Sequence, residues 1–577
     1  MRALYVANNA LSGPLPPEFG SMTGLRELGL TNNRGLEGVL PSGLAELDPF
    51  EVLLVGGTGL CAPSDPRFQA WLDGVHKRRV GLCEAGQPPM AYLAQAVQSR
   101  EFPVPLVAGR AALLRVFPIA QRATGAGIPA VRARFFVGGR EVHVENIPGK
   151  SDPIPDAVDE GSLSKSANAE IPAEVIQPGL EMVIEVDPDG ALDPALGVAT
   201  RIPESGRMAV DVRAMPLFDL TLIPFIWSET RDSLIVGLVE AMAADPENHE
   251  MFSDTRALLP VGDLVVTAHE PVLSTSNNAF TLLYQTAAIQ AMEGGTGHWK
   301  GMMNWPITGA GGVAWVPGRS SFSQPSHSTV AHELGHNMNL HHAPCGGPRR
   351  ADPSFPYSDG TVGVWGYDFR DGGGLVRPSI PDLMSYCGPP DGVSDYHFSN
   401  ALRYRLFDEG PLAAAVAART RSLLLWGGID ADGVPFMEPA FVVDAPAALP
   451  DSAGVYEIAG RSAAGAQLFS LSFTMPETAD GDGSSGFVFA LPVRPAWSAS
   501  LASITLTGPG GSVTLDGDSD RPMAILRDPR SGQVRAILRD VPDPAWARAD
   551  AAVALGAGPG LEVLFSRGIP GQAAWRP

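Results

Sequence analysis

Two histidines and a glutamate in residues 328–342 have the spacing of a metal-binding helix. His332 and His336 lie four positions apart, so an α-helix would place both imidazoles on one face, one turn apart. Two neutral ring nitrogens about 2.0–2.1 Å from one ion suit Zn²⁺. Glu333 follows the first histidine, where a carboxylate can take a proton from water that zinc has made more acidic. The pattern predicts a catalytic zinc site with Glu333 as general base.

The histidine pattern continues beyond this first turn, because His342 lies ten positions after His332. The segment resembles the metzincin family of zinc metalloproteases, whose HExxHxxGxxH motif has its third zinc ligand at this position. The resemblance implies His332, His336 and His342 as ligands, with the fourth position open for water. His341 is an alternative third ligand. A more remote alternative is a zinc site completed by an acidic residue downstream.

One residue departs from the metzincin motif. Asn339 stands where the family has the glycine that lets the chain turn after the helix. Asparagine is the non-glycine residue that best tolerates a left-handed backbone, so we expect the turn to form at some cost. The departure is the one feature that favours a domain without efficient activity.

A methionine turn is the second metzincin feature. The segment 382–387 resembles it, and Met384 lies 42 residues after His342. The resemblance implies Met384 as a structural base beneath the zinc. It also implies Tyr386 as an oxyanion stabiliser, because astacin-like and serralysin-like enzymes have a tyrosine two positions after this methionine. An ordinary core tyrosine is the alternative for Tyr386.

The four cysteines form two loose pairs, Cys61 with Cys83 and Cys345 with Cys387. An even number of cysteines without any CxxC predicts disulfides and an oxidising compartment, with buried thiols as the alternative. A disulfide between Cys345 and Cys387 would hold the loop after His342 to the methionine turn. A thiolate zinc ligand is the competing interpretation of this second pair.

The elements that must position these residues lie in residues 215–410. Predicted strands are 220–226, 263–267 and 312–316, and predicted helices are 233–244 and 278–292. Strands that alternate with helices predict an α/β domain. Residues 312–316 also resemble the edge strand along which metzincins bind extended peptides, although an ordinary central strand has the same pattern. We expect Ser328 or Thr329 to cap the helix that carries the histidines.

Residues 1–60 contain an internal repeat. The segment that begins at Leu4 is echoed from Leu28, 24 residues later, and a third, decayed copy begins at Leu53. The pattern resembles the leucine-rich repeat, and Cys61 with Cys83 then resembles a disulfide-closed C-terminal cap. Such arrays need about three repeats, so we expect a truncated N-terminus. The segment is either a surface-binding module or a remnant that covers the next domain.

Two further regions are rich in strand-length runs separated by glycine and proline, residues 88–214 and 421–577. The first predicts a β-sandwich-like domain, either a pro-segment or a spacer. The second predicts a C-terminal β-sandwich region with a hairpin at 523–538. Alternating aspartates occur at 516–520 and at Asp480 and Asp482. We interpret both as solvated turns, because the later glycine and glutamate of a calcium loop are missing.

Composition limits the classes that remain. The chain has 577 residues, 45% of them hydrophobic and 18% charged, which indicates a folded protein of about three to five structural units. A net charge of −22 argues against nucleic acid and anionic lipid as partners. No stretch reaches the roughly 20 apolar residues of a membrane span, and no signal peptide opens the chain.

The expected architecture is a multidomain α+β protein with four parts. These are leucine-rich repeats with a disulfide cap at 1–87, a β-rich domain at 88–214, a metallopeptidase domain at 215–420 and a β-sandwich region at 421–577. With 65 glycines, 53 prolines and few lysines, the composition indicates a GC-rich bacterial genome.

The expected function is a zinc-dependent endopeptidase that acts outside the cell or at its surface on a protein or glycoprotein. The chain resembles secreted bacterial metzincins, including the group that cleaves mucin-like glycoproteins. The alternative is a surface-binding protein or adhesin whose peptidase domain is weak or inactive. The complete set of His332, Glu333, His336, His342 and Met384 favours the enzyme. The sequence predicts no oligomeric state.

Overall fold

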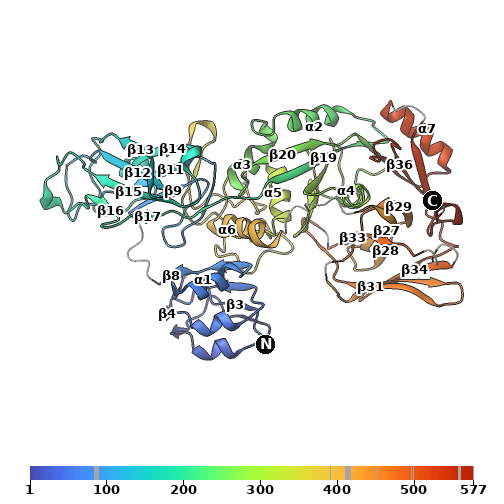
Figure 1. The fold of residues 1–577 in the computed structure, drawn as a ribbon, viewed down its shortest axis with the longest axis horizontal. Helices are drawn as coiled ribbons and strands as arrows, with labels where there is room; N and C mark the ends of the chain where they lie inside the picture. The colour runs from blue at the N-terminus through green and yellow to red at the C-terminus, as the bar shows by residue number, and fades with distance from the viewer. Residues whose placement is uncertain are drawn as a thin grey trace. The chain divides into compact units, whose positions relative to one another are not determined.

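A computed structural model describes the chain apart from residues 84–89, 390, 410–417, 451, 482, 495–496, 498–499, 557–559 and 576–577. Its contacts divide the chain into two compact units. The first unit comprises residues 1–217, 254–263 and 342–410, and the second comprises 218–253, 264–341 and 411–577. Figure 1 shows the elements of both units. Within the described residues, no helix has the length and apolar character needed to cross a membrane.

The repeated segments at the start of the first unit stack on one another as parallel strands, the blue part of the ribbon in Figure 1. One sheet consists of β1 (Ala3–Tyr5), β3 (Glu27–Gly29), β5 (Val52–Leu54) and β7 (Lys77–Arg79), and the other of β2 (Ser12–Gly13), β4 (Gly35–Val39), β6 (Gly59–Ala62) and β8 (Gly81–Leu82). The register pairs Leu4 with Leu28 and Leu28 with Leu53. The repeat in the sequence therefore becomes a repeat in space, with Leu28 and Leu53 fully buried.

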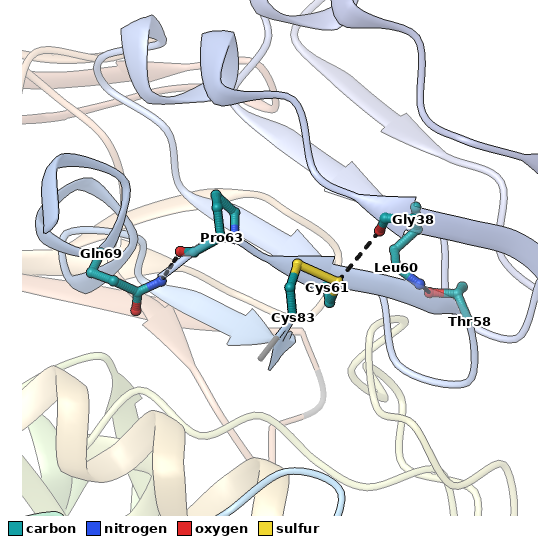
Figure 2. The surroundings of a disulfide bond; sticks show 7 residues. All are labelled: Gly38, Thr58, Leu60, Cys61, Pro63, Gln69 and Cys83. Carbon is teal, nitrogen blue, oxygen red and sulfur yellow. Dashed lines mark hydrogen bonds between the residues drawn. A yellow bond between two sulfur atoms is a disulfide. The ribbon is translucent and has the colours of Figure 1, made fainter. Parts of the chain in front are cut away.

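A disulfide joins Cys61 to Cys83 at the end of this repeat segment, as predicted (Figure 2). Between the two cysteines lies helix α1 (Pro66–Asp73). Its Gln69 side chain donates a hydrogen bond to the Pro63 carbonyl at 2.7 Å, which ties the helix to the chain just after β6. At the end of the repeat segment, the disulfide and this hydrogen bond hold the chain in place where another repeat would otherwise pack.

The β-rich part of the first unit consists of two main sheets that share one core. The first contains β9 (Ala91–Ala94), β11 (Ala112–Val116) and β14 (Ala167–Ile171), and the second contains β12 (Val131–Val137), β13 (Arg140–Ile147), β15 (Leu180–Val186), β16 (Arg201–Ile202) and β17 (Met208–Ala209). Leu114 from the first sheet and Phe135 and Ile184 from the second belong to the same buried cluster. The runs at 111–117, 130–137 and 180–186, which have strand length in the sequence, form β11, β12 and β15, whereas β13 was not predicted.

Residues 342–410 complete the first unit and pack against the repeat segment. They contain β25 (Gly366–Asp368), β26 (Gly374–Val376) and α6 (Asp395–Arg403). Leu54 of β5 shares a buried cluster with Ala343, Phe355 and Tyr396. Part of the repeat segment is therefore covered by this chain's own residues.

A long mixed sheet organises the second unit. Its order is β32 (Glu477–Thr478), β23 (Gly312–Val316), β24 (Ser320–Ser323), β22 (His298–Met302), β19 (Phe218–Trp227), β21 (Val272–Ser274), β37 (Val534–Arg539), β36 (Met523–Arg527) and β38 (Glu562–Ser566), with β20 (Leu264–Ala268) also on β19. Strands β19 to β22 and β24 pair in parallel, and β23 runs antiparallel to β24. Helices α2 (Leu234–Ala244) and α4 (Ala279–Glu293) lie where the sequence predicted helices.

The helix α4 is buried around most of its circumference. It packs against β22 and β24 of the long sheet and against two strands of a smaller sheet, β27 (Thr420–Ile429) and β33 (Ser485–Pro492). Its Leu283 and Ile289 share a cluster with Phe322 of the long sheet and Trp426 of the smaller one. A helix covered on several sides has no single apolar stripe, which explains its nearly uniform apolar sequence.

The C-terminal hairpin is formed as predicted, by β36 and β37, but it extends the long sheet. Strand β37 pairs in parallel with β21, and Ile525 and Ala524 contact different buried clusters on the two faces. A strand buried on both faces reads as a continuous apolar run, which does not reveal its sheet. The smaller sheets are β27, β28 (Pro435–Met437), β29 (Phe441–Ala445) and β33, and β30 (Tyr456–Ser462), β31 (Gln467–Phe473), β34 (Leu501–Gly508) and β35 (Gly511–Leu515).

Candidate metal centre

The helix α5 (His327–Asn337) carries the predicted metal-binding motif in the second unit. The helix begins earlier than expected, because Ser326 has the extended backbone of the N-cap residue. The prediction that Ser328 or Thr329 caps the helix is therefore wrong, and both lie in its first turn. The early start adds a turn before His332 and places the motif in the helix interior.

The rings of His332 and His336 converge as the four-residue spacing predicts. Their Nε2 atoms lie 3.1 Å apart. The Nδ1 of His336 lies 2.7 Å from the carbonyl oxygen of Leu340. Because a carbonyl only accepts, His336 Nδ1 carries the hydrogen and Nε2 keeps its lone pair. The Nε2 atoms of His332 and His336 therefore lie close enough together to bind one small cation between them.

The turn after α5 fixes that orientation. Asn339 has a left-handed backbone with φ of 66°, as expected from its place in the motif. Its N–H donates to the His336 carbonyl at 2.9 Å, and the Leu340 N–H donates to the Gly335 carbonyl at 3.1 Å. These two bonds form a Schellman-type helix end, which returns the Leu340 carbonyl to the ring of His336. The asparagine substitution therefore leaves the turn intact.

Three side chains of the second unit gather where the motif predicts a metal. The Nε2 atoms of His332 and His336 lie 3.5 and 3.0 Å from the carboxylate oxygens of Asp480. His336 is buried, while His332 and Asp480 are partly buried. The predicted third ligand, His342, is a buried residue of the first unit. Imidazole nitrogens and a carboxylate oxygen are donors that suit zinc. His341 is directed elsewhere, with its Nδ1 4.0 Å from Glu477 Oε1.

Asp480 is the residue that the sequence interpretation missed. Its carboxylate oxygens lie 3.0 Å from His336 Nε2 and 3.5 Å from His332 Nε2, so the interpretation as a solvated turn is wrong. Burial raises the pKa of Asp480, but the two histidines, when protonated in the metal-free chain, outweigh it and hold the pKa well below its usual range. Asp482, grouped with it from the sequence, lies outside the described residues. No sequence spacing identifies Asp480, because the pairing of β32 with β23 brings it to the histidines.

Glu333 lies one residue after the first histidine and is almost fully buried, with 2% of its surface exposed. Within the described part of the chain, its Oε2 has no hydrogen-bond partner. A Cβ added at Gly312 of β23 would lie 2.3 Å from Glu333 Oε1, so only glycine leaves room for this carboxylate. The glycine at position 312 of β23 thus lies where the carboxyl group of Glu333 needs space.

Burial also controls the ionisation of the groups around Glu333. Burial raises the pKa of its carboxyl well above the usual value, the Asp480 carboxylate raises it further, and His332 and Lys300 lower it. Lys300 of β22 is fully buried and donates to Ser321 Oγ at 3.2 Å. Burial lowers the pKa of Lys300 to about 7, although Glu333 opposes this shift. A carboxyl group with a raised pKa can exchange protons near neutral pH.

The predicted methionine turn lies in the first unit and is held by Asp382. Met384 is fully buried, and its N–H donates to Asp382 Oδ1 at 2.8 Å. Asp382 also accepts from the Ser394 N–H at 2.7 Å and lies 2.7 Å from His397 Nδ1. The Met384 carbonyl accepts from the Ala343 N–H at 2.9 Å, which joins the turn to the residue after His342.

Tyr386 contacts one of the predicted ligands. Its ring centroid lies 4.7 Å from that of His342, with the planes inclined at 60°. The residue is 47% exposed, so it is not a core tyrosine. A disulfide between Cys345 and Cys387 fixes the backbone beside it, as predicted, and the Tyr386 N–H donates to the Cys345 carbonyl at 3.0 Å. Because both cysteines are bonded, neither offers a thiolate to a metal.

Comparison with known proteins addresses the region around α5. No curated protein matches the chain. A family model matches the chain from within α4, through β22 to β24 and α5, to within β26, and the match ends before Met384 and Asp480. Residues 284–375 match this family model, described as Peptidase M66, and the match supports a peptidase of the metallopeptidase type.

Proposed function

We propose that this protein is a zinc-dependent endopeptidase that hydrolyses peptide bonds in extracellular proteins or glycoproteins. The observation that carries the proposal is the convergence of His332 and His336 beside the buried carboxyl group of Glu333, with His342 proposed as the third ligand. The three imidazoles would hold the ion. When bound, zinc supplies Lewis-acid chemistry that acidifies water and polarises a carbonyl group.

Glu333 performs the proton transfers in this proposal. Its carboxylate accepts a proton from the attacking water and returns it to the amine that leaves the peptide bond. Its burial excludes competing hydrogen bonds from bulk water, and the lack of a side chain at Gly312 leaves room for the carboxylate at its present position. Tyr386, beside His342, donates a hydrogen bond to the oxyanion that develops on the peptide carbonyl.

The surroundings of the site support an extracellular setting. Two disulfides are typical of an oxidising compartment. The net charge of −22 disfavours nucleic acid as a substrate. The binding-protein alternative depended on Asn339, and the turn at this residue is formed with the expected left-handed backbone. We therefore propose no second function.

The test compares the native chain with Glu333→Gln and with the exposed control Glu229→Gln. We expect each chain to bind one zinc ion by elemental analysis. Cleavage of casein should fall at least about a hundredfold in Glu333→Gln, because general-base catalysis contributes about 10²–10⁴, and should be unchanged in Glu229→Gln. Zinc bound without any cleavage, both by the native chain and by Asp480→Ala, which removes the carboxylate beside the histidines, would contradict the endopeptidase. A chain that binds no zinc would contradict the site itself.

A further inference from the structure

A short segment from the C-terminal part of the second unit occupies the outer edge of β23. Strand β32 runs antiparallel to β23, with Thr478 opposite Trp315 and Glu477 opposite Val316. The Ala479 N–H continues the ladder and donates to the Ala314 carbonyl at 2.9 Å. The other edge of β23 pairs with β24, so this segment fills the one edge of β23 that faces away from the sheet.

The same segment delivers a carboxylate to the histidines. Asp480 follows two residues after β32 and has a left-handed backbone with φ of 60°. This turn directs its side chain to His336 and His332, at 3.0 and 3.5 Å. A catalytic zinc site keeps its fourth position open, whereas a site with four protein ligands is closed. Asp480 would therefore close the site that the three histidines leave open.

Additional contacts hold the segment in this place. Thr478 and Ala479 are each 8% exposed. The Thr478 hydroxyl lies 3.3 Å from Ser485 Oγ, and the Ser485 hydroxyl also donates to the Pro476 carbonyl. The segment is thus packed and hydrogen-bonded along its length, in the way of a bound peptide.

We propose that residues 477–480 are an autoinhibitory segment that keeps the peptidase latent. The inference rests on the proposed function. An extended peptide that adds a strand to the free edge of a sheet uses main-chain hydrogen bonds of the kind that Ala479 makes with Ala314. A substrate that approaches along this edge meets a position already filled. A zinc ion bound by the histidines would also have the Asp480 carboxylate in its fourth position. Activation then requires the segment to leave β23.

The first test measures metal binding, which does not depend on turnover. Asp480→Ala removes the fourth ligand, so its Kd for Zn²⁺, measured by competition with a chelating dye, should rise at least about tenfold. The visible spectrum of the cobalt(II)-loaded protein should change as well, because water replaces the carboxylate. The exposed control Asp518→Ala should match the native chain in both measurements.

The second test measures cleavage of a flexible peptide. Asp480→Ala should raise kcat/KM at least about tenfold despite its weaker metal binding, because the fourth position becomes accessible and the segment loses its contact with the histidines. Ala479→Pro keeps the Asp480 side chain but removes the N–H that bonds to Ala314, so the segment should leave β23 more readily. It should raise kcat/KM in the same direction. Adding Glu333→Gln to Asp480→Ala should abolish the gained cleavage.

The outcomes separate the two proposals. An unchanged Zn²⁺ affinity and cobalt spectrum in Asp480→Ala would show that Asp480 is not a ligand and overturn the inference. Weaker Zn²⁺ binding with equal cleavage by the native chain, Asp480→Ala and Ala479→Pro would overturn latency while the peptidase stands. Weaker binding with no cleavage by any chain would overturn the peptidase function and the latency that rests on it. If Asp480→Ala does not fold, Ala479→Pro still tests whether the segment keeps the peptidase latent.

Discussion

At the scale of single residues, Lys300 carries a large free-energy cost in the centre of the second unit. It is fully buried on β22 and donates to Ser321 Oγ at 3.2 Å. Burial lowers its pKa from 10.5 to about 7. Between these two pH values the unfolded chain binds a proton that the folded chain lacks. Folding stability therefore rises with pH across this window, by up to about 1.4 kcal/mol per pH unit.

Replacing Lys300 with methionine removes this dependence. We expect Lys300→Met to be more stable than the native chain at pH 7.5, with a difference that shrinks as the pH approaches 9.5. Urea unfolding at several pH values, with a chelator present, measures it. Lys165→Met, which changes a partly exposed lysine, is the matched control and should parallel the native chain. Parallel pH profiles for Lys300→Met and the native chain would show that Lys300 is not neutral in the folded state.

The residues of the metal centre differ in how far sequence could predict them. His332, Glu333 and His336 lie within one helix, where spacing alone fixes their relative positions. Asp480 comes from a two-residue strand 138 positions after His342, and it reaches the site only through the pairing of β32 with β23. An aspartate among glycines has the sequence pattern of an exposed turn. The residues around Asp480 therefore did not predict that its side chain is mostly buried.

At the scale of elements, the turn after α5 links backbone conformation to the metal centre. Asn339 is in the left-handed region, and the next residue, Leu340, presents its carbonyl to His336 Nδ1 at 2.7 Å. A β-branched residue at this φ is disfavoured by about 1–2 kcal/mol, whereas glycine adopts it freely. The metal-binding ring therefore depends on a backbone conformation three residues away.

Two substitutions at Asn339 test this link. Asn339→Gly should change the free energy of unfolding by less than about 1 kcal/mol and leave Zn²⁺ affinity unchanged. Asn339→Val should lower the free energy of unfolding by about 1–2 kcal/mol and weaken Zn²⁺ binding in parallel, because the Leu340 carbonyl moves away from His336. Urea unfolding and chelator competition measure the two quantities. A valine variant with lower stability but native Zn²⁺ affinity would disprove the coupling.

Most long strands and helices could be predicted because each contains its own hydrophobic pattern. Strands β19, β20 and β23 and helices α2 and α4 lie within about two residues of their predicted bounds. Their partners could not be predicted in the same way. The hairpin of β36 and β37 was found, but its place beside β21 depends on contacts with residues about 260 positions earlier. Local patterns define elements, while non-local packing decides which sheet they join.

At the scale of the whole molecule, the repeat segment is joined to residues 342–410 within the first unit by buried ion pairs. Arg79 of β7 lies 3.2 Å from Asp395 and donates to the Tyr357 hydroxyl at 2.9 Å. Lys77 lies 3.2 Å from Asp352. These contacts join residues about 280 to 320 positions apart, and no sequence pattern predicted them. They favour the interpretation of the repeats as a cover for the next part of the chain.

The ion pair of Arg79 and Asp395 provides the test of that interpretation. The two side chains are 10% and 3% exposed, and burial raises the pKa of Asp395 even though Arg79 lowers it. Arg79→Met would leave the carboxylate buried without its partner. We expect the free energy of unfolding to fall by about 3–5 kcal/mol at pH 8. The loss should be smaller at pH 5, because removing Arg79 raises the pKa of Asp395 further and the neutral acid tolerates burial.

The double variant Arg79→Met/Asp395→Asn separates the ion pair from simple packing. Because it has no charge to bury, the double variant should recover part of the stability lost in Arg79→Met. Its remaining loss in the free energy of unfolding, relative to the native chain, should be the same at pH 5 and pH 8. Arg132→Met, which changes a half-exposed arginine of β12, should alter stability by less than about 1 kcal/mol. If Arg79→Met were as mild as this control at both pH values, the repeat segment would be only loosely attached. Its remaining surface would then be the better candidate for a separate binding module.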